Sequence, residues 1–410
     1  MLVMQKTGLR QTAIEVLDRI INHGAKADEL LATQVGNVAD ARDKALLHEL
    51  VYGVLRRYFT LEADASRFLK QKPQEAARLA LLLGTYQIRH MRIPAHAAVG
   101  ETVEAVKALY ASSSGLVNAV LRKVAESEMP AKFKPHQRVE LPNWLYASWR
   151  DAFGAEVVQE LAMLMQEKPP LCVAVFGDRD GWIRRATDAG FTARAGELAE
   201  TAVILGSGTD VVSLPGYDLG EFIVMDQAAQ VAALSLDASP GDLVLDLCAA
   251  PGGKTALLAR MHPKAQIIAV EQSEARIGRL KENLLRIKAT NVEVVQGDAT
   301  ALAYEDASAD AILLDAPCTA SGVIRRHPDA KFLHSPESVA RHTELQKKMV
   351  AEALRVLKPA GRLVYAVCSI HPDENERVVE DFSGLKTMQH LLPGEANDGF
   401  FVASFVKEAV

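Results

Sequence analysis

The sequence predicts a multidomain chain: an all-α bundle, then a small α+β subdomain, then an α/β domain with a Rossmann-like parallel sheet. Three observations predict this order. Apolar residues recur at helical spacing through residues 9–126, short strands and helices alternate up to residue 218, and longer apolar strands alternate with helices beyond it. With 410 residues, the chain is long enough for two or three hydrophobic cores.

Domain boundaries follow from changes in pattern and composition. We place the bundle at 1–128, a linker rich in Lys, Glu and Pro at 129–140, the subdomain at 141–218 and the α/β domain at 219–410. In the subdomain, the predicted strands are residues 171–176, 201–205 and 211–214, and residues 181–190 form a predicted helix. Residues 220–230 then open the large domain with a strand and the start of a helix.

The bundle shows clear helix signals. Thr12 and Glu15 fit a capping box at the start of the first helix, and residues 79–88 are apolar nearly all round, which predicts a central helix. Residues 1–128 hold 17 Lys and Arg against 14 Asp and Glu, whereas the rest of the chain holds 29 against 38. The net charge of −6 does not indicate a nucleic-acid binder, but the basic excess lies in the bundle.

The composition is that of an ordinary globular protein, with 49% hydrophobic and 24% charged residues. No apolar run approaches the roughly 18 residues of a membrane span. Residues 1–12 lack the apolar core of a signal peptide, so we expect a cytoplasmic protein with no membrane partner. The four cysteines have no CxxC spacing, which argues against a zinc site or a disulfide framework; we expect reduced thiols and no metal.

The large domain is organised around residues 242–255. Residues 243–247 form a predicted buried strand with Asp246 near its end, and Pro251, Gly252 and Gly253 force a tight turn before a helix. Ligands of open α/β sheets bind at such turns. A phosphate-binding P-loop would require glycine where Cys248 stands, and the dinucleotide fingerprint GxGxxG is absent. An ordinary strand-to-helix turn remains an alternative.

An acidic residue ends or follows each of the next three predicted strands. Glu271 ends the strand at 266–270, about 20 residues past the glycines, a spacing that suits the hydroxyls of a ribose. Asp298 follows the strand at 292–295, and Asp315 follows the strand at 311–314. The sequence therefore predicts several carboxylates at one edge of the sheet.

Two cysteines follow strand ends in the same domain. Cys318 lies in the segment Asp-Ala-Pro-Cys that begins at Asp315, and Cys368 ends the strand at 362–367. Both thiols should face the edge where a cofactor binds. A thiolate can add to an electron-poor ring carbon, which is the chemistry required when an unreactive carbon must be modified.

These motifs resemble those of S-adenosylmethionine-dependent RNA 5-methylcytosine methyltransferases. The motifs are residues 246–255, Asp315 to Cys318 with Arg325, Arg326, His327, Pro328 and Asp329, and Cys368-Ser369 followed by Glu374, Asn375 and Glu376. Residues 49–57, 80–91 and 114–124 resemble the NusB-like RNA-binding domain. The whole chain is similar to the RsmB/Sun family, which methylates one cytosine of small-subunit ribosomal RNA.

The resemblance implies a role for each motif residue. The cofactor would be S-adenosylmethionine, with Glu271 at its ribose, Asp298 at its adenine, and its methionine end held by Cys248, Ala249, Ala250, Pro251, Gly252, Gly253 and Lys254. Asp315 would serve both cofactor and base, Cys368 would be the nucleophile at carbon 6, and Cys318 would assist product release. Lys254 would contact a phosphate, the base or Asp315, or would be a surface lysine at a helix start. The partner would be 16S ribosomal RNA, free or partly assembled, bound by a monomer.

The chain departs from the family pattern at three positions. Glu271 stands where Asp is expected, Val367 where Thr is common and Phe332 where Trp is common. Two other classes of protein remain to be weighed. A Rossmann-type oxidoreductase would need the missing glycine fingerprint, and a non-catalytic RNA-binding or assembly factor would not need both thiols.

Overall fold

The computed structural model describes residues 8–36 and 38–408, and the chain forms two compact units. One unit is Met1–Glu167 with Ile324–Ser335, and the other is Lys168–Val323 with Pro336–Val410. The first seven residues, on which the signal-peptide prediction partly rests, lie outside the described ranges. Within those ranges, no helix combines the length and apolar character that crossing a membrane requires.

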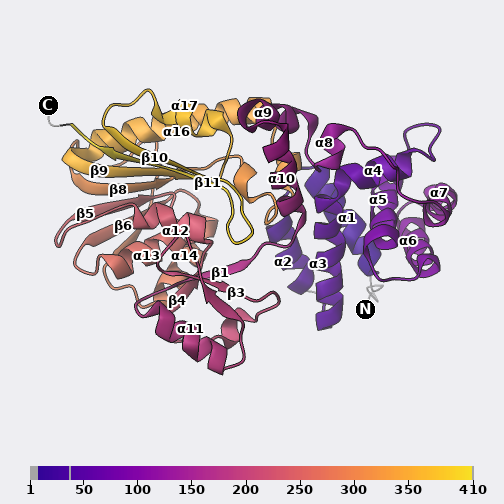
Figure 1. The fold of residues 1–410 in the computed structure, drawn as a ribbon, viewed down its shortest axis with the longest axis horizontal. Coiled ribbons are helices and arrows are strands. Elements are labelled where there is room, and N and C mark those ends of the chain that lie inside the picture. The colour runs from indigo at the N-terminus through magenta and orange to yellow at the C-terminus, as the bar shows by residue number, and fades with distance from the viewer. Residues whose placement is uncertain (1–7, 37, 409–410) are drawn as a thin grey trace, which may run out of the picture. The chain divides into compact units, whose positions relative to one another are not determined.

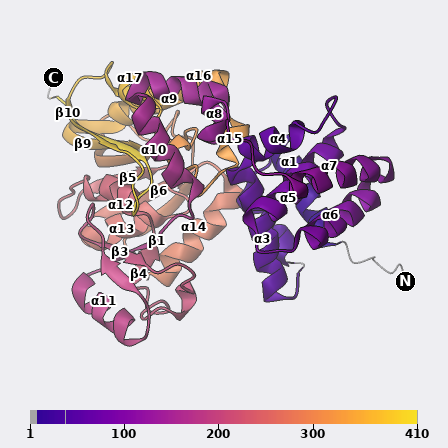
Figure 2. The same ribbon diagram turned by 45° about the vertical axis from the view of Figure 1, so that its right-hand side comes forward.

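The first unit is all-helical, as predicted (Figure 2). Its helices are α1 (Leu9–Ile21), α2 (Ala27–Gly36), α3 (Ala41–Arg56), α4 (Tyr58–Ser66), α5 (Glu75–His90), α6 (Ala95–Leu109), η1 (Ala111–Ser113), α7 (Ser114–Glu126), α8 (Pro135–Arg138), α9 (Asn143–Phe153), α10 (Ala155–Gln166) and α15 (Ala330–Leu333). Residues 79–83 of α5 are all buried, and this helix packs against α1, α3, α4, α6 and α7. The prediction of a central helix is therefore confirmed.

The capping box predicted at Thr12 and Glu15 is wrong. Helix α1 begins at Leu9 with Gly8 as its N-cap residue, so Thr12 lies inside the helix. The Thr12 hydroxyl instead donates to the Gly8 carbonyl at 3.4 Å, one helical turn earlier. The apolar side chains of this helix follow helical spacing from Leu9 onward, so the helix begins before the capping pattern at Thr12.

The segment between the bundle and the second unit is more ordered than a linker. It contains α8, and Glu140 at its end is only 3% exposed and accepts hydrogen bonds from the backbone N–H groups of Phe59 and Thr60. Helices α9 and α10 belong to the first unit, whereas the sequence placed residues 141–167 in the small subdomain.

The second unit begins with a four-stranded antiparallel sheet of order β2-β3-β1-β4. Its elements are β1 (Leu171–Val175), α11 (Arg179–Asp188), β2 (Ala193–Ala195), β3 (Ala202–Leu205), η2 (Val211–Ser213) and β4 (Phe222–Val224). The strand predicted at 211–214 is wrong, because Asp210 accepts hydrogen bonds from the Val212 N–H and the Ser213 hydroxyl and closes a 3₁₀ turn there. Strand β4 pairs with β1, so it completes this small sheet and does not join the large one.

A seven-stranded sheet of order β10-β11-β9-β8-β5-β6-β7 forms the rest of the unit. Its elements are α12 (Gln227–Leu234), β5 (Leu243–Leu247), α13 (Gly253–Met261), β6 (Gln266–Glu271), α14 (Glu274–Arg286), β7 (Val292–Gln296), β8 (Ala309–Asp315), η3 (Ser321–Val323), α16 (Pro336–Val356), β9 (Leu357–Val367), η4 (Pro372–Glu374), α17 (Glu376–Val379), β10 (Leu385–Leu391) and β11 (Phe400–Val406). Helices α12, α13 and α14 cover one face, and α16 and α17 cover the other (Figure 1).

The parallel strands explain where a ligand can bind. Strands β5 to β9 are parallel, and β11 is antiparallel to β9. The chain proceeds from β5 outward through β6 to β7, and then returns to β8 on the other side of β5. Ligands of open α/β sheets bind beyond the carboxyl ends of the strands at such a reversal. The loops after β5 and β8 therefore border the expected site.

Candidate active site

The loop between β5 and α13 is a backbone turn that requires glycine. Gly252 has φ +98°, and a Cβ added there would lie 2.6 Å from Leu280 Cδ1. The turn brings Cys248, Ala249, Ala250, Pro251, Gly253 and Lys254 around one hollow, which Asp246 and Asp315 also line. The sequence predicted these loop residues to act together, and the structure brings them together.

Asp246 is a buried acid at the base of this hollow. One of its carboxylate oxygens accepts a hydrogen bond from the Thr255 hydroxyl at 2.5 Å, whereas the other has no hydrogen-bond partner. Burial raises the pKa of Asp246 to about 7, although the Thr255 hydrogen bond opposes this shift. A buried acceptor without a partner is costly, so this oxygen is suited to a ligand donor. The sequence motifs do not assign a ligand contact to Asp246, although its place beside the glycine turn is a usable signal.

Glu271 ends β6 and is only 3% exposed. Its carboxylate accepts hydrogen bonds from the Ala250 N–H at 3.2 Å and the Ser273 N–H at 2.9 Å, and it forms an ion pair with Arg276 at 3.3 Å. The side chain thus ties the loop after β5 to the loop after β6. Arg276 also lies 3.5 Å from the second oxygen, so both oxygens of the carboxylate are held in place.

Asp298 follows β7 along the same edge. One carboxylate oxygen accepts from the Thr300 N–H and hydroxyl, both at 2.8 Å, and the other accepts from Gln272 at 3.3 Å. These contacts fix the orientation of the side chain at the turn. The second oxygen has only the long Gln272 contact, so it can accept from an additional donor.

Lys254 and Asp315 form an ion pair with Nζ and Oδ2 2.7 Å apart. The ammonium group also lies 5.0 Å from the centre of the Phe400 ring. Burial lowers the pKa of Lys254, but the adjacent Asp315 carboxylate outweighs burial and holds the pKa above its usual value. Of the contacts considered for Lys254, the structure contains the one with Asp315, and the side chain is not a free surface lysine.

Cys318 and Cys368 approach each other from different loops, with their Sγ atoms 3.4 Å apart. Both are free thiols and both are partly exposed. The hydrogen bond with Cys368, together with burial, raises the pKa of the Cys318 thiol well above its usual value. Strand pairing creates this proximity, because Asp315 of β8 lies opposite Ala366 of β9 and each strand then turns at the same edge.

The motif residues Arg325 to Asp329 belong to the helical unit, whereas Cys318 belongs to the second unit. Residues Ile324–Ser335 form part of the helical unit, where Asp329 accepts a hydrogen bond from the Ala27 N–H at 3.0 Å. Phe332, at the position where Trp is common, packs against Tyr58 and Phe59. Arg325 and Asp329 are buried. The roles of this motif therefore include packing within the helical unit, which its sequence did not indicate.

The strand order, the glycine turn and the acids at the strand ends define a Rossmann-like S-adenosylmethionine-dependent methyltransferase. The family model "16S rRNA methyltransferase RsmB/F" matches residues 233–401, and the NusB family model matches residues 7–126. The sequence is 37% identical to ribosomal RNA small subunit methyltransferase B of Vibrio cholerae over 98% of each chain, and 35% identical to that of an Enterobacter species over 99% of this chain and 100% of the relative. The chain belongs to the ribosomal RNA small subunit methyltransferase B family.

Solved structures support the fold. PH0851 superimposes with a TM-score of 0.80 at 20% identity, covering 98% of this chain and 100% of that chain. NSun6 from Pyrococcus horikoshii, crystallised with SFG, superimposes with a TM-score of 0.59 at 20% identity, covering 66% of this chain and 99% of that chain. The fold class predicted from the sequence is confirmed.

The residues present fit S-adenosylmethionine, the cofactor of this family. The unpartnered oxygen of Asp246 suits a ligand ammonium group, and the glycine turn leaves room for backbone to approach the ligand. Glu271 and Asp298 lie successively farther along the same edge, in the order in which ribose and adenine would follow. The cofactor predicted from the sequence is therefore supported by the donors and acceptors of the structure.

Proposed function

We propose that the protein methylates carbon 5 of one cytosine in 16S ribosomal RNA, with Cys368 as the nucleophile. The observation that carries this proposal is the pair of thiols 3.4 Å apart beside the Lys254–Asp315 ion pair. Carbon 5 of cytosine is a weak nucleophile, so the ring must be activated before it can accept a methyl group. A thiolate that adds to carbon 6 provides that activation.

Cys368 is the better nucleophile of the two cysteines. The raised pKa of Cys318 keeps its thiol protonated, so it can donate to the Cys368 sulfur and favour a thiolate there. Before the target cytosine binds, the Lys254 cation supports the same charge distribution, because Cys368 contributes to the raised pKa of Lys254. The two sulfurs can therefore have different tasks, with Cys368 as the nucleophile and Cys318 as the group that assists release.

The Lys254–Asp315 pair supplies a proton to the target cytosine. Both groups are charged in the ion pair, but exclusion of water by a bound base favours transfer of a proton from Lys254 to Asp315, which leaves two neutral groups. Asp315 then donates to ring nitrogen 3 and stabilises the charge that develops when Cys368 adds to carbon 6. The target cytosine must be unpaired or flipped to reach these groups.

The cycle closes by elimination. When bound, S-adenosylmethionine supplies an electrophilic methyl group on a sulfonium. Cys318 first gives its own proton to solvent, and its thiolate then accepts the proton from carbon 5. The electron pair of that C–H bond re-forms the double bond between carbons 5 and 6 as Cys368 leaves as a thiolate, and ring nitrogen 3 returns its proton to Asp315. The high pKa of Cys318 makes its thiolate a strong base for this step.

Cofactor contacts follow from the same geometry. Asp246 would accept from the ammonium group of the cofactor, the loop from Cys248 to Lys254 would hold its methionine end, and Glu271 and Asp298 would bind the ribose and the adenine. These assignments use groups that line the hollow or lie along the same sheet edge.

The experiment that tests the proposal follows labelled methyl transfer to RNA. The protein is incubated with labelled S-adenosylmethionine and either naked 16S ribosomal RNA or mature small subunits, and modified positions are read by bisulfite sequencing. We expect one 5-methylcytosine in naked RNA and little transfer to mature subunits. Label on another nucleoside, or on another ring position, would overturn the proposal.

A further inference from the structure

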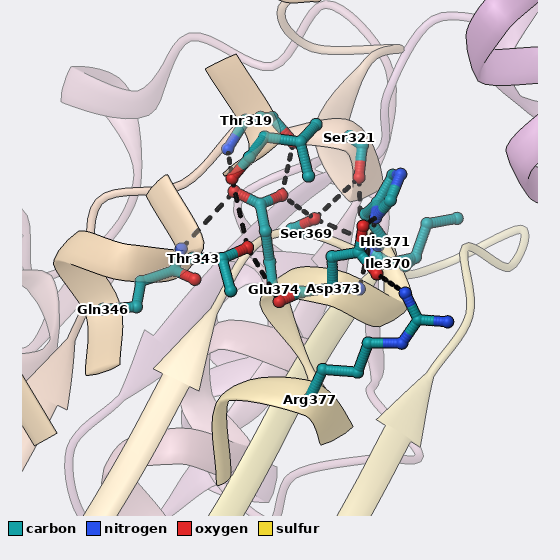
Figure 3. A network of polar contacts seen from close by, with 11 residues as sticks. Thr319, Ser321, Thr343, Gln346, Ser369, Ile370, His371, Asp373, Glu374 and Arg377 are labelled. Carbon is teal, nitrogen blue, oxygen red and sulfur yellow. Dashed lines mark hydrogen bonds and ion pairs between the residues drawn. The ribbon is translucent and has the colours of Figure 1, made fainter. Parts of the chain in front are cut away.

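The carboxylate of Glu374 connects the two cysteine loops (Figure 3). It accepts hydrogen bonds from the N–H of Thr319 at 2.8 Å and from the Thr319 hydroxyl, and also from the Ser369 hydroxyl at 2.6 Å. Thr319 directly follows Cys318, and Ser369 directly follows Cys368. One side chain therefore holds the neighbour of each thiol.

The surrounding residues hold Glu374 and Cys318 in place. Gln346 of α16 donates to the Pro317 carbonyl at 2.9 Å and to the Glu374 carboxylate at 3.4 Å. Pro317 and Thr319 flank Cys318, so its loop is held on both sides. The Tyr365 hydroxyl of β9 donates to the Glu374 carbonyl at 2.7 Å and fixes the backbone of the acid itself.

The direction of these hydrogen bonds requires an acceptor at position 374. The Ser369 hydroxyl donates to Glu374 and its oxygen accepts from the His371 N–H at 3.1 Å. Its 2.8 Å contact with Ser321 must therefore use the Ser321 hydroxyl as the donor. The Ser321 oxygen in turn accepts from the Ile370 N–H at 3.1 Å. This chain of hydroxyls ends on the carboxylate.

Stability alone does not explain a buried acid here. Glu374 is fully buried, and the donors to its carboxylate are the neutral groups of Thr319, Ser369 and Gln346. Removing a carboxylate from water is costly, and hydrophobic residues of similar volume often replace buried charged groups without loss of stability. A carboxylate with two oxygens can, however, bind two loops at once with fixed geometry.

We propose that Glu374 is a positioning residue for methyl transfer, which fixes Cys318 and Cys368 relative to each other through Thr319 and Ser369. The inference rests on the proposed function, in which Cys368 attacks carbon 6 and Cys318 assists release. Glu374 itself takes part in no chemical step with the RNA. It acts by holding each sulfur where its step takes place.

Glu374→Gln tests this role with little change in size. The Gln amide has an NH₂ group in place of one carboxylate oxygen. In one orientation this NH₂ group faces the Thr319 N–H, and two donors cannot bond to each other. In the other orientation it faces the Ser369 hydroxyl, whose oxygen already accepts two hydrogen bonds. Either the hydrogen bond from the Thr319 N–H or the one from the Ser369 hydroxyl must then be lost. We expect kcat to fall about 100-fold, as for a misplaced reacting group, with the KM for S-adenosylmethionine unchanged. Asp373→Asn is the matched control, because Asp373 lies in the same 3₁₀ turn and pairs with Arg377 instead.

Two milder variants separate positioning from a loss of folding stability. Ser369→Ala removes the tie beside Cys368 and should slow formation of the covalent RNA adduct. Thr319→Val removes the hydroxyl tie beside Cys318 and should slow release, so that the adduct accumulates. If both variants slow the same step, or if Glu374→Gln keeps a normal kcat, the positioning role is refuted.

Failure of this inference can be told apart from failure of the proposed function. If Cys368→Ala still methylates RNA, the proposed function is wrong. If Cys368→Ala is inactive while Glu374→Gln has a normal kcat, only the positioning role is wrong. Alkylation of Cys368 by iodoacetamide in the absence of RNA gives a further readout, because Glu374→Gln should change its rate and Asp373→Asn should not.

Discussion

The sulfur atoms of Cys318 and Cys368 lie 3.4 Å apart although 50 residues separate them in the sequence. The pairing of β8 with β9 brings the two loops to one edge of the sheet, and Gly322 N–H donates to the Cys368 carbonyl at 3.0 Å. This geometry gives each thiol a separate task, and each task can be removed by one substitution.

Replacement of Cys368 by alanine should abolish methyl transfer to RNA, because no nucleophile would then add to carbon 6. Binding of S-adenosylmethionine should survive, since the cofactor contacts come from other loops. Calorimetric titration with the cofactor and a transfer assay on the same preparation check both statements. Normal turnover by this variant would refute the assignment of the nucleophile.

Replacement of Cys318 by alanine should leave adduct formation intact and block its resolution. We expect a protein–RNA complex that survives denaturing electrophoresis and requires Cys368, so Cys318→Ala/Cys368→Ala is the control. The release role would be wrong if no complex forms and methylation continues at the full rate.

Replacement of Lys254 by methionine should slow the chemical step. The variant keeps most of the length of the side chain but leaves Asp315 without its cation and without a proton source. Removal of one group that stabilises developing charge costs about 100- to 1,000-fold in kcat. Single-turnover kinetics with saturating cofactor measure this step, and an unchanged rate would exclude the proton-supply role of the pair.

Affinity for S-adenosylmethionine should rise as the pH increases through about 7. Burial raises the pKa of Asp246 to about 7 in the cofactor-free protein, so below this pH the acid is protonated and must lose its proton to meet a cationic ammonium group. The limiting dependence below the pKa is about tenfold in affinity per pH unit. Asp246→Asn should flatten the curve between pH 5 and 8. The same slope in wild type and variant would contradict a contact between Asp246 and the cofactor.

A further prediction concerns the helical unit, where Lys331 and Glu140 are both buried. Burial lowers the pKa of Lys331, despite the opposing effect of Glu140, and burial raises the pKa of Glu140. Lys331→Met would leave the Glu140 carboxylate without its cation and should destabilise the unit by about 3–5 kcal/mol. Hydrogen exchange at the Phe59 and Thr60 amides, which donate to Glu140, should report the loss.

The double variant Lys331→Met/Glu140→Gln provides the control for that prediction. It removes both charges, so it should recover part of the lost protection. Unchanged exchange in the single variant would show that the buried pair does not stabilise the unit.

Much of the large sheet could be predicted because its strands are short apolar runs that end in acids. Strands β5, β6, β7 and β8 lie where the sequence placed them. Strand β11 (Phe400–Val406) was missed, although its apolar residues give a usable signal. Its position beside β9 depends on pairing between residues about 40 positions apart.

The candidate site was only partly predictable. The glycine turn, Asp315 and the two cysteines carry local motifs, so the sequence indicated the same edge. The contacts of Glu374 with Thr319 and Ser369 leave no periodic signal, because they join two loops through single side chains. The packing of residues 324–335 in the helical unit was also missed, since a segment between two strands of a sheet gives no local sign that it belongs to another unit.

Trapping the covalent intermediate identifies the cysteine that becomes bonded to RNA. A 16S ribosomal RNA fragment with 5-fluorocytosine at the target position is incubated with the protein and S-adenosylmethionine, because fluorine at carbon 5 prevents the final elimination. Mass spectrometry of the digested complex should find the nucleotide attached to the peptide that contains Cys368. Attachment at Cys318, or transfer of the methyl group to unmodified RNA without any adduct forming on the fluorinated one, would show that Cys368 is not the nucleophile.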